Sequence, residues 1–157
     1  MKIDTREFVQ LQLMFKKPRS IKLFDLKKKQ WKRYVQLVKL LSNQIYWEKA
    51  NDYLKIVESF CNNKITDEDF QTKFYAIRKS AANNYERLVE LLEQDVLSNE
   101  LKLTKIEINP KSKGFTTAID EPIFYLLDMD YPLLTVQEIQ QIMNDTIRPK
   151  LEKYCNK

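Results

Sequence analysis

Glycine and histidine are the residues in which this sequence is poorest. It contains one glycine, Gly114, and no histidine among its 157 residues. Loops that cradle phosphate in the Walker or dinucleotide manner need several glycines close together, so the chain cannot build one. Without an imidazole there is no Ser-His or Cys-His nucleophile, no histidine base and no ordinary zinc site. These two absences exclude most of the common classes of enzyme.

Thiols and long apolar runs are also scarce. Cys61 and Cys155 are the only cysteines, so no disulfide framework is indicated and a reducing, cytoplasmic location is expected. No run approaches the roughly 18 apolar residues of a membrane span, and the first residues lack the apolar core of a secretory signal. With 43% hydrophobic and 31% charged residues, the composition is typical of a soluble globular protein.

The charges are distributed unevenly along the chain. Residues 1–50 hold thirteen basic and four acidic residues, whereas the remainder carries an excess of acids, and the whole chain has a net charge of +5. Between Lys113 and Arg148 there are six acidic residues and no basic one. The molecule is therefore expected to present faces of opposite charge to its partners.

Two helices are predicted in the basic N-terminal part. Apolar residues in the first sixteen positions have helical spacing, and Pro18 follows them as a stop signal. A second helix is expected from Asp25, a candidate N-cap, to Leu41, because its apolar residues fall on one side and its lysines on the other. This second helix is amphipathic with a basic face.

A helical hairpin is predicted in the middle of the chain. The apolar residues from Ala50 to Cys61 follow the i, i+3, i+4, i+7 rule. After a turn over residues 62–65, Thr66 is expected to cap a second helix whose first turn is acidic. The apolar stripe of that helix runs from Phe70 to Leu92.

The C-terminal part is expected to hold a long connection and two further helices. Residues 101–114 alternate poorly, and a single strand there would have no partner, so they are interpreted as a connection. An apolar helix is expected over residues 116–127, with Pro122 in its first turn or dividing it. Thr135 and Glu138 predict a capping box for the last helix, which Pro149 is expected to kink or interrupt.

Together these elements predict an all-α fold. We expect a single-domain antiparallel helix bundle of five or six helices, in which residues 1–49 form a basic helical extension and residues 50–157 the bundle proper.

Catalysis and metal binding are weakly supported. The neighbouring carboxylates Asp120 and Glu121, and the pair Asp128 and Asp130, have the chemistry of an acid and a base or of cation ligands. However, Asp128-Met129-Asp130 lacks the glycine and the terminal glutamate of a calcium loop, and adjacent carboxylates are common on solvated surfaces. The sequence therefore predicts a protein without enzymatic activity, cofactor or metal.

Two surfaces are candidates for binding a partner. Four lysines on the second helix, Lys28, Lys29, Lys32 and Lys39, suit nucleic acid or an acidic partner, although Trp31 and Tyr34 nearby fall on the apolar side and a solvated basic face is the simpler interpretation. The segment 115–131 interleaves acids and aromatic residues, a combination that suits a cationic pocket on another protein. The alternative is that its aromatic residues are core and its acids only solvate the surface. The candidate contact residues are Asp120, Glu121, Tyr125, Asp128, Asp130 and Tyr131.

Residues 53–74, YLKIVESFCNNKITDEDFQTKF, resemble the colicin D type immunity proteins. The C-terminal part is also similar: Gly114-Phe115, an apolar helix running into Asp128-Met129-Asp130-Tyr131, and a last helix that opens over 135–138. The resemblance covers roughly residues 50–154 and implies a small helical protein that plugs the active site of a toxin nuclease with its carboxylates, imitating the anionic RNA substrate. Here Asp120, Glu121, Asp128 and Asp130 would carry that role. Members of the family are usually shorter and acidic, whereas this chain is basic and has about fifty additional N-terminal residues.

The sequence thus favours a non-enzymatic, immunity-like inhibitor that presents its acidic segment to a basic toxin nuclease. The first alternative is a helical protein that binds nucleic acid or an acidic partner through residues 27–39. The second is a structural role in a larger assembly that uses both faces.

Overall fold

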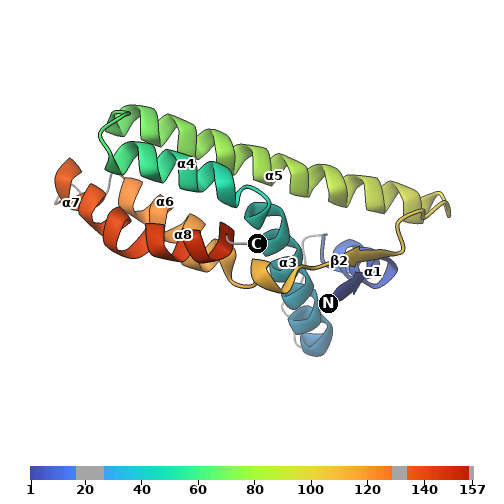
Figure 1. The fold of residues 1–157 in the computed structure, drawn as a ribbon. Helices are drawn as coiled ribbons and strands as arrows, with labels where there is room; N and C mark the ends of the chain where they lie inside the picture. Colours follow the sequence, from blue (N-terminus) through green and yellow to red (C-terminus); the bar gives the residue numbers. More distant parts are fainter. Residues whose placement is uncertain (17–26, 129–133, 156–157) are drawn as a thin grey trace.

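The all-α prediction is confirmed by the structure, a computed structural model that describes residues 1–16, 27–128 and 134–155 (Figure 1). The predicted N-cap Asp25 lies outside the described residues. The helices are α1 (Thr5–Lys16), α3 (Lys28–Trp47), α4 (Ala50–Cys61), α5 (Asp67–Leu97), α6 (Glu121–Leu127), α7 (Val136–Ile142) and α8 (Arg148–Cys155). Short helical turns, η1 (Pro110–Ser112), η2 (Thr116–Asp120) and η3 (Met143–Ile147), precede or join them.

The predicted hairpin of α4 and α5 forms where the sequence places it. The hydroxyl of Thr66 accepts a hydrogen bond from the amide of Asp69 at 3.1 Å, which caps α5 at its N-terminus. The capping box of α7 is also present, because Thr135 and Glu138 each bond the other's backbone amide. Both predictions depend on hydrogen bonds between residues three positions apart, and these bonds form in the folded chain.

A small β-ladder corrects the prediction for both of the segments that form it. β1 (Lys2–Asp4) occupies part of the predicted first helix and pairs antiparallel with β2 (Lys105–Glu107), which was expected to have no partner. Ile3 lies opposite Ile106 and is fully buried. A strand of three residues is too short to show a period, and its partner lies about a hundred positions away, so local patterns do not reveal it.

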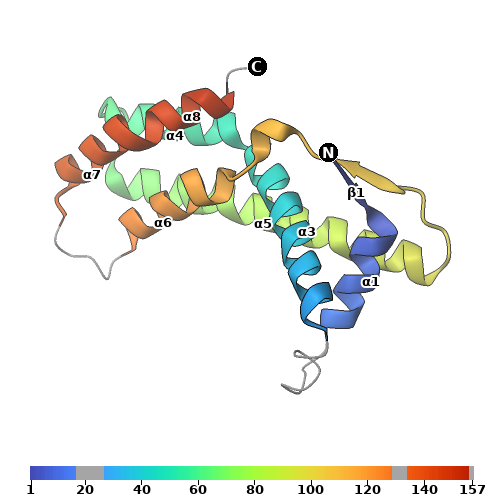
Figure 2. The same cartoon turned by 90° about the horizontal axis from the view of Figure 1, so that it is seen from below.

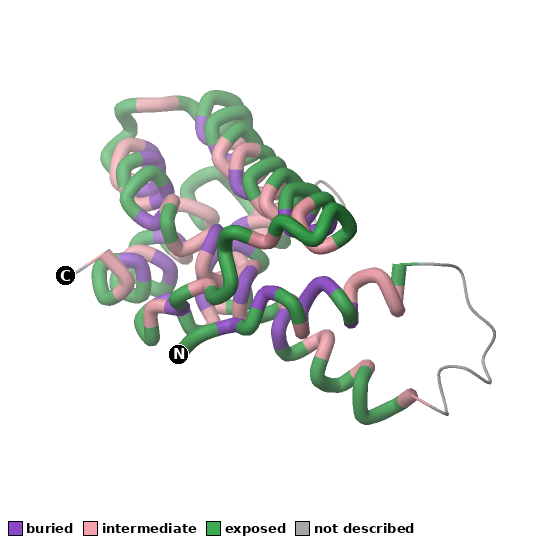
Figure 3. The backbone as a smooth tube through the Cα atoms, turned by 90° about the vertical axis from the view of Figure 1, so that its right-hand side faces the viewer, coloured by how far each residue is buried: buried purple, intermediate pink, exposed green. Residues whose placement is uncertain are grey.

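Two hydrophobic clusters hold the elements together, and α5 contributes to both. The first joins α4, the N-terminal half of α5, η2, α6, η3 and α8; the second joins β1, α1, α3 and the C-terminal half of α5. Figure 2 shows α3 crossing between these two parts of the molecule, and Figure 3 shows buried positions on the sides of the helices that face one another. The basic extension is therefore docked on α5 through an apolar core of its own.

Each of the two prolines in the C-terminal helices follows a π-helical turn. η2 ends two residues before Pro122 and η3 ends two residues before Pro149. A proline has no amide hydrogen, and its ring clashes with the carbonyl four residues earlier, so a widened turn at this point relieves both problems. The helical backbone continues through Pro149 from residue 136 to residue 155, so the prediction that this proline interrupts the last helix is wrong, whereas the kink stays a prediction.

Candidate functional site

The predicted acidic segment lies mainly on η2 and α6, a continuous helical stretch over residues 116–127. Phe115, Ile119 and Ile123 are fully buried and hold this stretch against α4 and α8. Its opposite side is in solvent: Glu121 is exposed, and Tyr125 keeps 60% of its surface accessible. The exposed side of α6 is therefore available to a partner while its inner side builds the core.

Asp120 does not belong to this exposed side, which corrects the prediction that it is a contact residue. Only 2% of Asp120 is exposed. One carboxylate oxygen accepts a hydrogen bond from the hydroxyl of Tyr53 at 2.8 Å, and the other accepts one from Nε of Arg78 at 3.1 Å. Its charge is compensated inside the same molecule, so Asp120 joins α4, α5 and η2 to one another instead of meeting a partner.

The surroundings of Asp120 perturb the ionisation of its neighbours. Burial raises the pKa of Asp120 above its ordinary value, although the hydrogen bond from Tyr53 and the charge of Arg78 act in the opposite direction. Burial also raises the pKa of Tyr53, with the nearby carboxylate as the second cause. The guanidinium of Arg78 lies 4.2 Å from the ring centre of Phe124, a cation–π contact that ties α6 to α5. This cluster holds the exposed side of α6 in place.

An apolar groove of about 360 Å³ runs beside Tyr125. It is lined by Pro122, Tyr125, Leu126, Leu134, Ile142, Thr146 and Ile147. Every lining residue comes from the stretch between Lys113 and Arg148, which holds six acids and no basic residue. The groove therefore offers apolar surface within an acidic region, a feature that only the folded chain brings together.

The other predicted contact residues follow directly after α6. Asp128 is half-buried and takes an extended conformation at the end of the helix. Asp130 and Tyr131 lie outside the described residues, so their part in the contact stays a prediction. Of the six predicted residues, Glu121, Tyr125 and Asp128 lie on α6 or directly after it with accessible surface, whereas Asp120 is buried.

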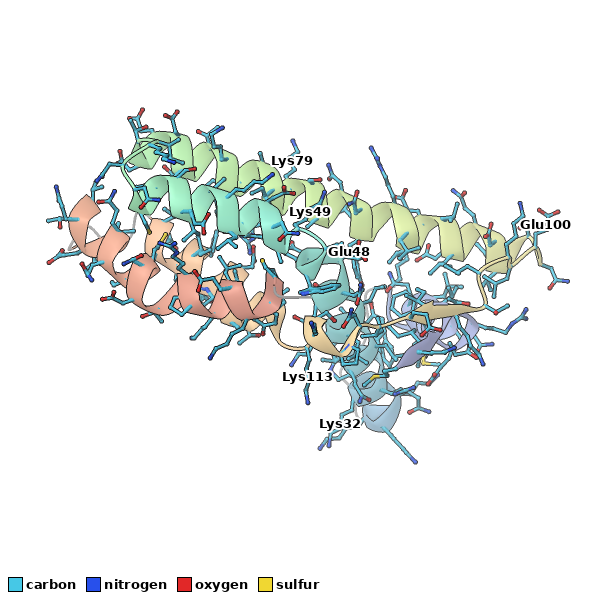
Figure 4. All side chains as sticks on the ribbon, in the orientation of Figure 1. Lys32, Glu48, Lys49, Lys79, Glu100 and Lys113 are labelled. Atoms are coloured by element: carbon cyan, nitrogen blue, oxygen red, sulfur yellow. The ribbon has the colours of Figure 1, made fainter. Side chains whose placement is uncertain are left out.

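The lysines of the predicted basic surface all lie on the solvent side of α3. Lys28, Lys29, Lys32 and Lys39 are exposed, and none of them forms an ion pair within the described part of the chain. Figure 4 shows Lys32 on the first half of α3, at the lower edge of the molecule. These lysines form a cationic surface separate from α6.

The aromatic residues beside these lysines belong to packing. The rings of Trp31 and Tyr34 lie 5.1 and 5.5 Å from that of Phe15 on α1, measured between ring centres. The hydroxyl of Tyr34 also donates to the side chain of Gln12. Trp31 and Tyr34 therefore serve packing between α1 and α3, and the part of this surface that the structure describes offers nucleic acid its charges.

The two thiols do not line the groove beside Tyr125 and are poorly suited to nucleophilic chemistry. Cys61 and Cys155 are both half-buried, and burial is the largest of the causes that raise the pKa of each. A raised pKa keeps a thiol in its protonated, weakly nucleophilic form at neutral pH.

Comparisons with models of protein families, with curated proteins and with solved structures each find no match for this chain. The resemblance to the immunity proteins therefore rests on the sequence pattern alone. Among the helices of the described ranges, none is both long enough and apolar enough to pass through a membrane.

Arg78 was missed at the level of sequence and Asp120 was assigned to the exposed side, although a signal for their pairing was present. Arg78 falls four residues after Phe74 and three before Ala81, inside the apolar stripe of α5. Asp120 similarly falls three residues before Ile123 on its own stripe. Two opposite charges, each within an apolar stripe, indicate a buried ion pair. The groove residues of α7 and η3 carried no comparable signal.

Proposed function

We propose that this chain is a non-enzymatic binding protein, an immunity-like inhibitor that places the exposed side of α6 against a cationic site of a nuclease-type toxin. The observation that carries the proposal is the apolar groove beside the exposed Tyr125, which lies wholly within the acidic stretch of the chain. Of the proposed contact residues, Glu121, Tyr125 and Asp128 are accessible in the described part of the chain.

The chemistry of this surface suits a basic protein partner. Carboxylates such as Glu121 raise the rate of encounter with a positively charged surface and fix its orientation. A tyrosine contributes a large, stiff contact area, which makes it frequent among the residues that dominate binding energy. The groove next to Tyr125 gives an apolar side chain of the partner a place to be buried.

Asp120 takes an indirect part in this proposal. Its bonds to Tyr53 and Arg78 fix the start of α6 relative to α4 and α5. The exposed residues one and five positions later, Glu121 and Tyr125, are thereby presented on a held helix. A prearranged surface loses less conformational entropy on binding than a mobile one.

The experiment begins with the reading frames beside the gene of this chain. If one encodes a protein with a basic C-terminal nuclease domain, that domain is purified and its affinity for the chain is measured by calorimetry, together with inhibition of RNA cleavage. Replacing Tyr125 by alanine is expected to weaken the complex by about 2 kcal/mol or more, as for a central anchor. Glu121→Lys is expected to slow association and to reduce inhibition.

Glu86→Lys is the matched control, because Glu86 is an exposed acid on the C-terminal half of α5, in the other part of the molecule. It makes the same change in net charge and is expected to leave affinity unchanged. Equal effects of Glu121→Lys and Glu86→Lys, or no inhibition of any neighbouring nuclease domain, would contradict the proposal.

A second candidate function is the binding of nucleic acid through α3. It is favoured by four exposed lysines that form no ion pair with any residue of the described ranges, Lys28, Lys29, Lys32 and Lys39. Binding through phosphate contacts falls steeply with salt, and removing a contacting lysine lowers the slope of log K against log salt by about 1. Salt titrations with Lys29→Gln and Lys32→Gln test this function, and binding that is absent or insensitive to salt rules it out.

A further inference from the structure

Two adjoining hollows lie where the α3–α4 junction, η1 and α8 meet, away from the groove beside α6. The larger, of about 540 Å³, is lined by Trp47, Glu48, Ala50, Asn51, Asn109, Lys111, Tyr154 and Cys155. The smaller, of about 330 Å³, is lined by Lys111, Ala118, Lys150, Lys153 and Tyr154. Lys111 and Tyr154 line both, so the two hollows lie next to each other. In Figure 4, Glu48 at the end of α3 and Lys113 just after η1 lie above and below the end of α8.

The aromatic walls of the larger hollow are held in place by the fold. The indole Nε1 of Trp47 donates to the backbone carbonyl of Tyr154 at 3.1 Å. The ring of Tyr154 meets Phe115 edge to face at 5.0 Å, and its hydroxyl donates to the carbonyl of Lys113 at 3.1 Å. Two fixed aromatic side chains in one hollow of this volume match the apolar part of a small-molecule site.

Polar groups in the larger hollow suit the edge of a nucleobase. Asn109 uses its side-chain carbonyl to cap η1, accepting from the amide of Lys111 at 2.9 Å, so its NH₂ group is left as a donor. Asn51 adds an exposed amide, and the carboxylate of Glu48 is an acceptor suited to an exocyclic amino group. The carboxylate also disfavours an anionic group at this end.

The charged residues that line the smaller hollow are all lysines, whereas Glu48 and Lys111 both line the larger one. Lys150 and Lys153 are exposed, and their spacing of three residues puts them on one side of α8. Within the described ranges, neither takes part in an ion pair. Ammonium groups in this arrangement attract a phosphate. The fold thus places a cationic cleft directly beside an aromatic hollow with hydrogen-bonding groups.

We propose that the two neighbouring hollows together bind a nucleoside phosphate, with an amino-bearing base against Trp47 and Tyr154 and the phosphate at Lys150 and Lys153. Aromatic side chains stack on bases without regard to sequence, and Glu48 with the two amides favours a base that carries an amino group. Glu48 at one end and the lysines at the other set the direction of the ligand. The site is separate from the surface of α6 and from the lysines of α3, so it stands independently of the proposed function.

The fluorescence of Trp47 provides a direct measurement. The chain has two tryptophans, so Trp31→Phe leaves Trp47 as the only indole, and calorimetry on the unaltered chain provides a check that does not depend on this replacement. Titration with AMP is expected to quench Trp47 in a saturable manner. Adenosine and inorganic phosphate alone are each expected to bind about tenfold more weakly or worse, and UMP, which lacks the amino group, more weakly than AMP.

Charge reversal locates the phosphate. Lys150→Glu with Lys153→Glu is expected to weaken AMP binding by about tenfold or more and to leave adenosine binding unchanged. The matched control is Lys73→Glu with Lys79→Glu, two exposed lysines on α5 that line neither hollow. A short RNA with a 5′-phosphate separates the two sources of this chemistry: tighter binding than AMP identifies the end of a strand, and equal or weaker binding identifies a free nucleotide.

Three results would overturn the inference. They are the absence of any saturable signal by fluorescence and calorimetry up to about 10 mM AMP, adenosine binding as tightly as AMP, and equal losses in the Lys150/Lys153 variant and its control. Circular dichroism of each variant shows whether it is folded. Should the Lys150/Lys153 pair fail to fold, the single replacements Lys150→Gln and Lys153→Gln give the same comparison.

Discussion

Replacing Tyr53 by phenylalanine tests whether the bond to Asp120 stabilises the fold. Tyr53 is fully buried, and its hydroxyl donates to Asp120 at 2.8 Å. Phenylalanine keeps the ring and its edge contacts with Phe74 and Phe115, so no large cavity arises. What is lost is one hydrogen bond to a buried carboxylate, which is worth about 1.5–3 kcal/mol. We expect the free energy of unfolding to fall by that amount.

Urea unfolding followed by circular dichroism measures this loss, and an unchanged dependence on urea shows that the unfolded state is unaffected. Tyr125→Phe is the matched control, because it removes the same hydroxyl from a residue that is 60% exposed. Its expected effect is below about 0.5 kcal/mol. If Tyr53→Phe also falls within about 0.5 kcal/mol of the unaltered chain, the buried bond contributes nothing net, and the stabilising role assigned to Asp120 is wrong.

Three further outcomes are expected. In carbon NMR, the carboxyl group of Asp120 is expected to titrate above its ordinary pKa. Because its pKa is then higher in the folded than in the unfolded chain, its contribution to stability is complete below the unfolded-state pKa and is lost as pH rises through the folded-state pKa. Asp120→Asn is expected to remove this pH dependence of the free energy of unfolding. Ile3→Ala is expected to cost about 2–5 kcal/mol in urea unfolding, because Ile3 is fully buried in the second cluster; a cost below about 1 kcal/mol would show that β1 is not part of the core. Gly114→Ala is expected to cost about 1–2 kcal/mol through its φ of +73°, since the added methyl group meets only Tyr154 at 3.8 Å; an unchanged melting temperature would contradict this.

Local patterns predicted most of the helices, because the information needed lies within a few residues. Thr66 and Thr135 mark helix starts by bonds that span three positions. The β-ladder was missed because its strands have three residues each and meet only in the folded chain. The pattern within one segment does not show which distant segment it will pair with.

The candidate site was predicted less completely than the fold. Glu121 is exposed as expected, whereas its neighbour Asp120 is buried, since adjacent helical residues point about 100° apart. Composition alone does not distinguish the exposed acid from the buried one. The hollows around Tyr154 combine segments distant in sequence, and the groove beside Tyr125 forms only where α6 packs beside α7 and η3, so neither could be predicted from local patterns.

The 31-residue helix α5 runs through both hydrophobic clusters and connects them. Tilting one cluster against the other requires either breaking main-chain hydrogen bonds in the middle of this rod or pulling one cluster off it. Both routes are costly, so a molecule held at α6 carries α1 and α3 along in a fixed orientation. The distance between α6 and the basic end of the protein is therefore set by the length of α5.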